Sequence, residues 1–527
     1  MASPIPPADL DQTLLEAILA AMRRHGARKV VLRDADRQAL TYRGLLLGAL
    51  VLGDKLAGMT RPGEAVGVLL PNVVGLPVTI AGLNAFGRVA ALLNFTAGSR
   101  NLALALATGP IHTVLTSRRF IATAKLEEVV ASLSSTEVTP GRPPRIVYLE
   151  DVRAAIGPLD KLKGLARALY ARAFAARSGM APDRTAVILF TSGTEGTPKG
   201  VALTNRNLIA NARQILAHAD GMLTPDDIVV NPLPMFHSFG LTAGTLMPLL
   251  GGMTTALYPS PLHYKQIPKL IRQSRATLLF ATDTFLQGYA RAAEPGDLAS
   301  LRYVIAGAER VKTSTRRLWA SSGAAILEGY GATECAPVIA CNLPTASREG
   351  SVGPLLPLIE ARLDPVEGIS EGGRLHVRGP NVMAGYLLHE RPGVLVAPAR
   401  GWHDTGDIVT IEDGFVTIRG RAKRFAKIGG EMVSLAAVET LASGLWPDSQ
   451  HVVVSIPDER KGEQLILVTD RPEADKTALL EHARARGFPE LWVPKAVLVV
   501  AAIPVLGSGK VDLAATRQLA SATRPLL

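Results

Sequence analysis

The chain has 527 residues, which is too long for one hydrophobic core, so two or more domains are expected. Apolar residues make up 47% of the chain and charged residues 20%, a composition that excludes a disordered protein. The net charge of +11 would suit a nucleic-acid partner, but no recognition motif accompanies it, so we expect no nucleic-acid binding.

The cysteines and the N-terminus indicate a cytoplasmic protein. Cys335 and Cys341 form neither a disulfide framework nor a zinc-binding spacing. The first residues lack the basic and apolar regions of an export signal. Residues 66–87 and 238–262 carry no charge and are long enough to span a membrane, but Pro, Gly and polar residues interrupt both. We therefore expect buried strands and helices there, and no transmembrane helix.

The first hundred residues alternate between two periodicities. Residues 40–56 have helical apolar spacing from Leu45 onward, and residues 63–72 predict a turn, a strand and a second turn. Residues 78–86 predict another helix and residues 89–94 another strand. This alternation is typical of an α/β protein with parallel strands.

Residues 161–177 hold five basic residues and no acid, with Leu162, Leu165, Leu169 and Phe174 at roughly helical spacing. A basic amphipathic helix can lie on the anionic inner face of a membrane. The same pattern also fits an ordinary surface helix, so a peripheral membrane contact is one of two readings.

Residues 186–202 contain a short apolar strand, predicted over Val187 to Phe190, that opens into a loop rich in Gly, Thr and Ser with one lysine. Asn205 is predicted to cap a helix that begins at Arg206. Hydroxyls, backbone amides and Lys199 offer donors to phosphate oxygens, and the glycines let the backbone approach a ligand. The spacing is not that of a Walker A loop, and most such clusters are surface turns.

The order Thr-Ser-Gly-Thr-x-Gly-x-Pro-Lys-Gly in this loop resembles the signature of the adenylate-forming acyl ligases. The sequence of residues 40–42, 67–72 and 92–98 is similar to that of the ligase half of the bifunctional 2-acylglycerophosphoethanolamine acyltransferase/acyl-carrier-protein synthetases. The similarity extends from about residue 35 to about residue 515. It implies an α/β fold with a large, multi-subdomain N-terminal domain over residues 1–422, which holds ATP and the acyl group. A small mobile α+β lid would follow over residues 423–527, with a hinge near Lys423.

The resemblance assigns most of the ATP site to the large domain. It implies that the signature loop binds the β- and γ-phosphates through Thr191, Ser192, Gly193, Thr194 and Lys199. Two further strand-to-turn segments would wall the adenine and bind the α-phosphate. The residues implied there are Gly307, Ala308 and Glu309, through their backbone, then Tyr330 and Gly331 at the adenine, Thr333 at the α-phosphate and Glu334 as the ligand of Mg²⁺.

The remaining implied residues border the acyl group or come late in the chain. His237, in the segment 231–242, is expected to position the carboxylate end of the acid rather than to act as a general base. Asp407 is expected to bind the ribose and Arg421 the ribose or a phosphate, whereas Asp404 is expected to be structural. Lys510, in the Gly-Ser-Gly-Lys sequence near the C-terminus, is implied as the lysine that supports adenylation.

The implied reaction uses ATP and Mg²⁺ to convert a fatty acid to an acyl adenylate, which then passes its acyl group to a thiol. The apolar segments 239–257 and 278–285 favour medium or long acids over acetate or aryl acids. The similarity to the acyl-carrier-protein synthetases implies that the thiol belongs to acyl carrier protein, and coenzyme A is the alternative.

Two other functions are alternatives to this one. Acyl transfer to lysophospholipid would need a His-x4-Asp motif, and none of the ten histidines has Asp five residues later. The chain could still serve a lysophospholipid reacylation system without its own acyltransferase domain. A non-catalytic acyl-binding protein should have lost Lys510, Glu334 or Asp407, and all three are present.

Overall fold

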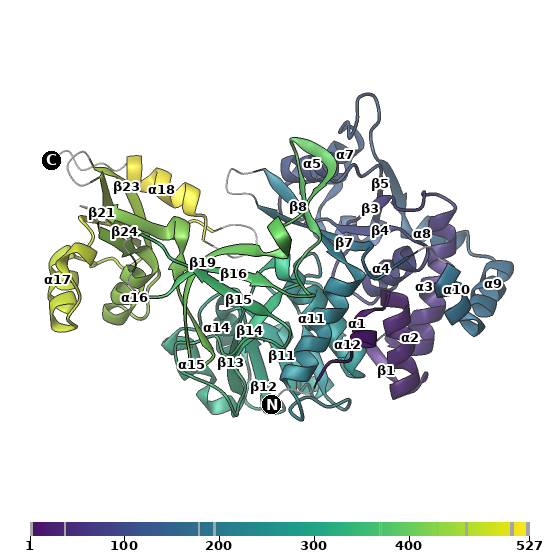
Figure 1. Ribbon diagram of the computed structural model, residues 1–527, viewed down its shortest axis with the longest axis horizontal. Helices are drawn as coiled ribbons and strands as arrows, with labels where there is room; N and C mark the ends of the chain where they lie inside the picture. The colour runs from purple at the N-terminus through teal and green to yellow at the C-terminus, as the bar shows by residue number, and fades with distance from the viewer. Residues whose placement is uncertain are drawn as a thin grey trace. The chain divides into compact units, whose positions relative to one another are not determined.

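The computed structural model describes residues 4–35, 38–177, 180–192, 197–367, 369, 371–428, 431–458, 462–505 and 511–522. The chain forms two compact units (Figure 1). The first comprises Met1–Ser347, Gly353–Glu360 and Arg378–His403. The second comprises Arg348–Val352, Ala361–Val377 and Asp404–Leu527.

The first unit contains two eight-stranded sheets. In one of them, six parallel strands run from β13 to β1, and an antiparallel strand closes each edge. Its spatial order is β14 (Val338–Cys341), β13 (Ala325–Gly331), β12 (Tyr303–Ala306), β11 (Leu278–Ala281), β9 (Ile228–Asn231), β10 (Thr254–Leu257), β1 (Val30–Arg33) and β2 (Ala39–Thr41).

The second sheet of this unit has five parallel strands and three antiparallel ones. Its order is β18 (Arg391–Val396), β17 (Gly385–Leu388), β8 (Pro198–Thr204), β7 (Thr185–Ser192), β4 (Val89–Leu92), β3 (Ala65–Val68), β5 (Thr113–Thr116) and β6 (Arg145–Tyr148). The signature loop therefore joins β7 to β8, and β17 pairs with β8 from nearly two hundred residues further along the chain.

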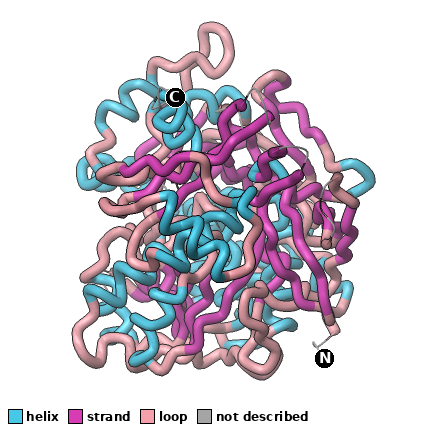
Figure 2. Tube along the Cα trace, turned by 90° about the vertical axis from the view of Figure 1, so that its left-hand side faces the viewer, coloured by secondary structure: helices cyan, strands magenta, loops and turns pink. Residues whose placement is uncertain are grey.

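One buried cluster joins strands of both sheets to the helices packed against them. Figure 2 shows the helices lying between and around the strands. Helices that contribute to this cluster include α2 (Leu14–His25), α3 (Tyr42–Ala57), α4 (Gly75–Ala85), α11 (Asn205–His218), the π-helix η1 (Phe239–Leu246) and α12 (Met247–Gly251). Both charge-free stretches of the sequence thus form interior elements: β3 with α4, and η1 with α12 and β10.

Shorter helices complete the first unit. They are α1 (Pro7–Leu10), α5 (Ser99–Thr108), α6 (Arg118–Ala124), α7 (Glu127–Ser134), α8 (Leu149–Ala154), α9 (Pro158–Leu169), α10 (Ala171–Arg177), α13 (Gln266–Ser274), α14 (Asp283–Ala292) and α15 (Thr313–Trp319). Across the described residues, no helix combines the length and the apolar character that crossing a membrane requires.

Helix caps explain where two helices begin. Thr41 caps α3, so this helix starts at Tyr42, ahead of the apolar spacing that begins at Leu45. The prediction that Asn205 caps the next helix was wrong by one residue. Thr204 is the cap of α11, because its hydroxyl accepts from the Asn207 amide while the Asn207 side chain accepts from the Thr204 amide.

The second unit contains two smaller sheets. One has the order β15 (Glu360–Asp364), β16 (Gly373–Arg378), β19 (His403–Glu412) and β20 (Phe415–Arg421). The other contains β22 (Glu431–Ser434), β21 (Phe425–Ile428), β24 (Gly462–Thr469), β23 (His451–Asp458) and β25 (Ala496–Val499). Three helices accompany them: α16 (Leu435–Leu445), α17 (Lys476–Ala485) and α18 (Leu513–Ala522).

The predicted fold class is confirmed: a large N-terminal α/β domain precedes a smaller C-terminal domain built on a sheet. The compact units divide the chain differently from the predicted boundary at residue 422, since β16, β19 and β20 group with the C-terminal sheet. Compactness does not show where a chain bends, so the hinge near Lys423 stays a prediction.

Candidate active site

Four loops of the first unit begin at one edge of its first sheet. Strands β9, β11, β12 and β13 are parallel, so their carboxyl ends share this edge, where ligands of open α/β sheets bind. The segment with His237 follows β9, Thr284 follows β11, Gly307–Glu309 follow β12, and Thr333 and Glu334 follow β13. Residues predicted from separate motifs therefore gather at the carboxyl ends of the strands of one sheet.

The loop after β12 is tied to the start of α14 by the carboxylate of Glu309. Its Oε2 atom accepts hydrogen bonds from the amide of Thr284 at 3.0 Å and from the Thr284 hydroxyl at 2.9 Å. Ala308 has a φ of 67°, which is uncommon for a residue other than glycine. The Glu309 side chain thus holds the loop in place. The backbone of the loop is then the part that could contact a flat ring.

Phe239 connects the predicted acyl wall to the predicted adenine wall. Its ring packs edge-on against Phe280 of β11, with 5.6 Å between the centroids. A Cβ atom at Gly307 would lie only 3.1 Å from the same ring. The absence of a side chain at Gly307 therefore lets the start of η1 approach the β12 loop closely.

The turn after β13 requires glycine at position 331. A Cβ atom there would lie 2.3 Å from the carbonyl oxygen of Pro337, across the β13–β14 pairing of Gly331 with Val338. Tyr330 is buried, with 8% of its surface exposed, whereas Thr333 and Glu334 are half-buried. The last two residues therefore remain partly accessible.

Glu334 is held by β17 and the residues before it. The phenol of Tyr386 donates a 2.7 Å hydrogen bond to its Oε1 atom, and the Met383 amide donates one of 2.7 Å to its backbone carbonyl. Lys199 Nζ lies 5.5 Å from the centroid of the Tyr386 ring, within cation–π range. Lys199 and Glu334, predicted from two distant motifs, thus meet at one tyrosine that sequence reasoning missed.

The donor set suits a magnesium–phosphate complex. Mg²⁺ keeps few protein ligands and takes its remaining oxygens from phosphates and water. Within the described ranges, no group of three or more His, Cys, Asp or Glu residues could hold a metal unaided. Glu334 offers one hard carboxylate, with Lys199 nearby for phosphate charge, so these residues fit the ion that the fold family implies.

Neither cysteine is suited to covalent catalysis. Burial raises the pKa of the Cys335 thiol well above its usual value, and the neighbouring Glu334 adds to this rise. Burial also raises the pKa of Cys341 to about 12. Both residues therefore stay as thiols at neutral pH, so neither supplies a thiolate nucleophile.

His237 lies on the surface, just before the π-helix η1. Its amide donates to the Pro234 carbonyl, its own carbonyl accepts from Leu241, and its ring packs edge-on against Phe236 at 4.8 Å. These contacts hold the His237 backbone and ring, and the positioning role stays a prediction.

The second unit carries the predicted ribose residues as a pair. Asp407 and Arg421 face each other across β19 and β20, with 3.2 Å between Arg421 Nε and Asp407 Oδ1. The Asp407 carboxylate is buried, whereas the Arg421 side chain is exposed. The pair presents a buried carboxylate beside an exposed guanidinium, which is a suitable set for a ribose diol.

Asp404, expected to be structural, accepts two hydrogen bonds from Arg374, at 2.8 and 2.5 Å. Burial alone would raise the pKa of Asp404, but Arg374 and the amide of Gly406 hold it below the usual value. Four other predicted sites cannot be placed. Gly193, Thr194 and Lys510 lie outside the described residues, as does the side chain of Ser192.

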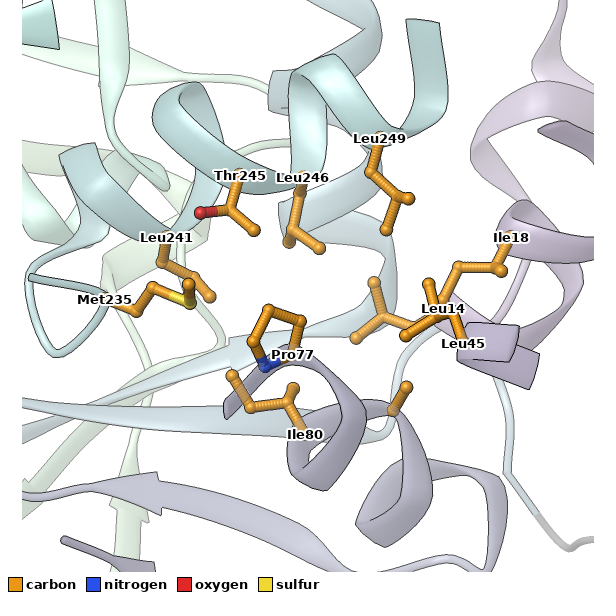
Figure 3. Close-up of a pocket in the computed structure, with 11 residues that line it drawn as sticks. Leu14, Ile18, Leu45, Pro77, Ile80, Met235, Leu241, Thr245, Leu246 and Leu249 are labelled. Atoms are coloured by element: carbon orange, nitrogen blue, oxygen red, sulfur yellow. The ribbon is translucent and has the colours of Figure 1, made fainter. Parts of the chain in front are cut away.

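An apolar cavity of about 20 Å³ lies beside η1 (Figure 3). Met235, Leu241 and Thr245 reach it from one side, and Pro77 and Ile80 of α4 from the other. Leu14, Ile18, Leu45, Ala81, Leu246 and Leu249 complete its lining. It is about the size of one water molecule, so it does not itself hold an acyl chain.

Comparison with known proteins gives one family. The model of a family described as AMP-binding enzyme matches residues 19–387. A feruloyl-CoA synthase of Amycolatopsis sp is 32% identical over 491 residues, which cover 90% of this chain and 92% of that protein. A long-chain-fatty-acid–CoA ligase of Yersinia pestis is 28% identical over 483 residues, which cover 86% of this chain and 84% of that protein.

Solved structures share the fold. ATP-bound MatB from Rhodopseudomonas palustris superposes with a TM-score of 0.79 at 22% identity, covering 96% of this chain and 99% of that one. A fatty acyl CoA synthetase of Mycobacterium tuberculosis gives a TM-score of 0.74 at 22% identity, covering 97% and 99%.

Proposed function

The chain belongs to the AMP-binding enzyme family, and from this premise we propose that it is an ATP- and Mg²⁺-dependent ligase that joins a fatty acid to coenzyme A. The family makes it an adenylate-forming acid–thiol ligase. The observation that carries the proposal is the meeting of Lys199, Tyr386 and Glu334 beside the carboxyl ends of β12 and β13. It joins the motif expected at the terminal phosphates to the motif expected at the metal.

In the first half-reaction, a carboxylate oxygen of the acid attacks the α-phosphorus of ATP and the bond to the β-phosphate breaks. Positioning and charge stabilisation supply the catalysis of such a step. Lys199 and the signature-loop donors would hold the leaving pyrophosphate, with Thr333 at the α-phosphate. Glu334 would hold Mg²⁺, which when bound would offset the negative charge of the phosphates.

Two sets of residues are proposed for the nucleoside. The backbone of Gly307–Glu309 and the ring of Tyr330 would enclose the adenine, and Asp407 with Arg421 would bind the ribose. His237 would orient the carboxylate of the acid. Lys510 would be delivered by a lid that hinges near Lys423, and would balance the charge at the attacked phosphorus.

In the second half-reaction, the thiol sulfur attacks the acyl carbonyl carbon and AMP leaves. We propose coenzyme A as the acceptor, because the relatives described above are named for coenzyme A thioesters. The expectation that acyl carrier protein is the acceptor rests on sequence similarity in a few motifs and has no further support. It is therefore the alternative acceptor that the test must distinguish.

A fatty acid is the proposed substrate because the segments expected to line the acyl group are apolar in the structure. η1 is almost entirely buried. Phe280 of β11 packs against Phe239, the first residue of η1. An aromatic acid is the second candidate, since Phe239 and Phe280 could stack a ring and a 32% identical relative is named a feruloyl-CoA synthase.

The test is pyrophosphate release with a panel of saturated fatty acids and ferulate, followed by thioester formation with either acceptor. The proposal expects release with medium or long fatty acids and thioester with coenzyme A. Pyrophosphate release with ferulate alone would make an aromatic acid the substrate. Thioester formation with carrier protein alone would make acyl carrier protein the acceptor.

The cytoplasm is the proposed location, because both cysteines are free thiols. A fatty acid partitions into membranes, so contact with a bilayer would place the enzyme near its substrate.

A further inference from the structure

Helix α9 presents its apolar side to solvent. Among the described large apolar side chains, the four most exposed all lie on this helix or next to it: Leu169 at 74%, Tyr170 at 73%, Leu159 at 72% and Leu162 at 62%. Leu159, Leu162, Leu165 and Leu169 recur every three or four residues, so they form one stripe, which we call the leucine face.

The opposite side of α9 is polar and packs inward. Asp160 pairs with Lys55 at 2.8 Å, and Arg167 pairs with Asp54 at 2.8 Å. Both partners belong to α3, against which α9 lies at the outer edge of the first unit (Figure 1). An ordinary surface helix would bury its leucines and expose these charges, so α9 is turned the other way round.

This orientation is fixed by close packing. Gly164 is buried between α9 and α3, and a Cβ atom there would lie 2.3 Å from the Val51 side chain. Arg167 also lies over the rings of Phe86 and Phe174, at 5.2 and 5.8 Å. The helix therefore cannot roll its leucines inward without breaking two ion pairs and a tight contact.

The charges around the leucine face are positive. Lys161 and Lys163 border it on either side of the helix, and Arg172 follows on α10; all three are exposed. The one acid of α9, Asp160, is engaged inward by Lys55. Long basic side chains beside an apolar stripe can bind lipid headgroups while the stripe enters the acyl region.

We propose that the leucine face of α9, with Lys161, Lys163 and Arg172, docks this protein on an anionic lipid bilayer. A second copy fits less well, because a twofold contact through this face would bring Lys161 and Lys163 of each copy together. The inference rests on surface chemistry and does not depend on which acid or acceptor the enzyme uses.

The test is sedimentation of the full chain with vesicles of phosphatidylcholine, with and without phosphatidylglycerol, at low and high salt. Wild type should sediment with the anionic vesicles, less so at high salt, and poorly with neutral ones. Leu162→Glu, and Lys161→Glu with Lys163→Glu, should each weaken anionic-vesicle binding by about tenfold or more. All three positions are exposed, so melting temperature and turnover of a water-soluble short acid should not change.

Matched controls are Leu262→Glu, which alters another exposed leucine, and Lys265→Glu, which alters another exposed lysine. Both should bind vesicles like wild type. Failure of wild type to sediment with anionic vesicles, or equal loss in the α9 variants and the controls, would overturn the proposal. A dimer that Leu162→Glu dissociates, without vesicle binding by wild type, would assign the leucine face to a second copy instead.

Discussion

The phenol of Tyr386 donates a 2.7 Å hydrogen bond to the carboxylate of Glu334, although 52 residues separate them in the chain. The pairing of β17 with β8 sets Leu387 opposite Gly200 and so also brings Tyr386 close to Lys199. A single tyrosine thus lies between the residue proposed for Mg²⁺ and the lysine proposed for phosphate.

Tyr386→Phe should slow adenylation about tenfold or more, with a raised requirement for Mg²⁺. A hydrogen bond to a charged group contributes about 1.5–3 kcal/mol, and the retained ring keeps the contact with Lys199. Pyrophosphate release over a magnesium series measures the effect. Tyr258→Phe, which removes a hydroxyl bonded to His263, is the control. If both variants behaved like wild type, Tyr386 would have no part in the site.

Lys510→Ala should abolish adenylation far more than thioester formation from supplied acyl-AMP. Its charge is needed at the attacked phosphorus, and the lid is expected to swing away before the thiol arrives. The two half-reactions are measured separately, with Lys495→Ala, which breaks an ion pair to Asp458, as the control. Equal loss in both half-reactions would contradict an alternating lid.

Affinity should rise with the chain length of the acid until the pocket ends. Each buried CH₂ contributes about 0.8 kcal/mol, which is roughly a fourfold gain per carbon. Competition between saturated acids for adenylation measures this slope. A flat response from acetate to palmitate would show that the apolar residues around Phe239 do not contact the acyl chain.

Gly331→Ala should destabilise the first unit by about 1–3 kcal/mol, because the new methyl group would overlap the Pro337 carbonyl. Gly75→Ala is the control, since open space surrounds its Cβ position at the start of α4 and it should not destabilise. Thermal unfolding of both variants measures the difference. Equal melting temperatures would mean that the β13–β14 turn relaxes freely.

The first unit should lose stability below about pH 6.5 partly through His218. Burial lowers the pKa of His218, more than its hydrogen bond to the Cys341 carbonyl raises it. The unfolded chain therefore binds the proton more readily, so stability falls as pH drops from the ordinary histidine value of about 6.5 through the lowered one. His218→Gln should flatten this part of the melting-temperature profile, and an unchanged profile would contradict this cause.

Local sequence signals predicted the helices and strands expected within residues 40–94 and 187–206, because hydrophobic periodicity and caps act over a few residues. Their errors have local causes. Thr204 and Asn205 are both residue types that cap helices well. Thr204 is the cap of α11 because it exchanges two hydrogen bonds with Asn207. Residues 161–177 contain the expected helical pattern, but it divides into α9 and α10 at Tyr170. Periodicity alone could not show that the leucines of α9 face outward, since that depends on ion pairs to α3.

Contacts between distant segments were beyond sequence reasoning. The motifs named Lys199, Glu309 and Glu334 individually, but Tyr386 carries no signal of its own and becomes visible only through strand pairing. The sequence likewise gave no hint that the Glu309 carboxylate holds Thr284. The acceptor is a comparable case, because the shared motifs describe adenylation and do not identify the thiol.

The most direct test of the account is ATP–pyrophosphate exchange driven by a long-chain fatty acid in the absence of any thiol, for wild type and Glu334→Gln. The account predicts exchange by wild type without coenzyme A, strict dependence on Mg²⁺, and a severe loss in Glu334→Gln. Exchange that appears only when coenzyme A is added, or that Glu334→Gln leaves unchanged, would contradict it.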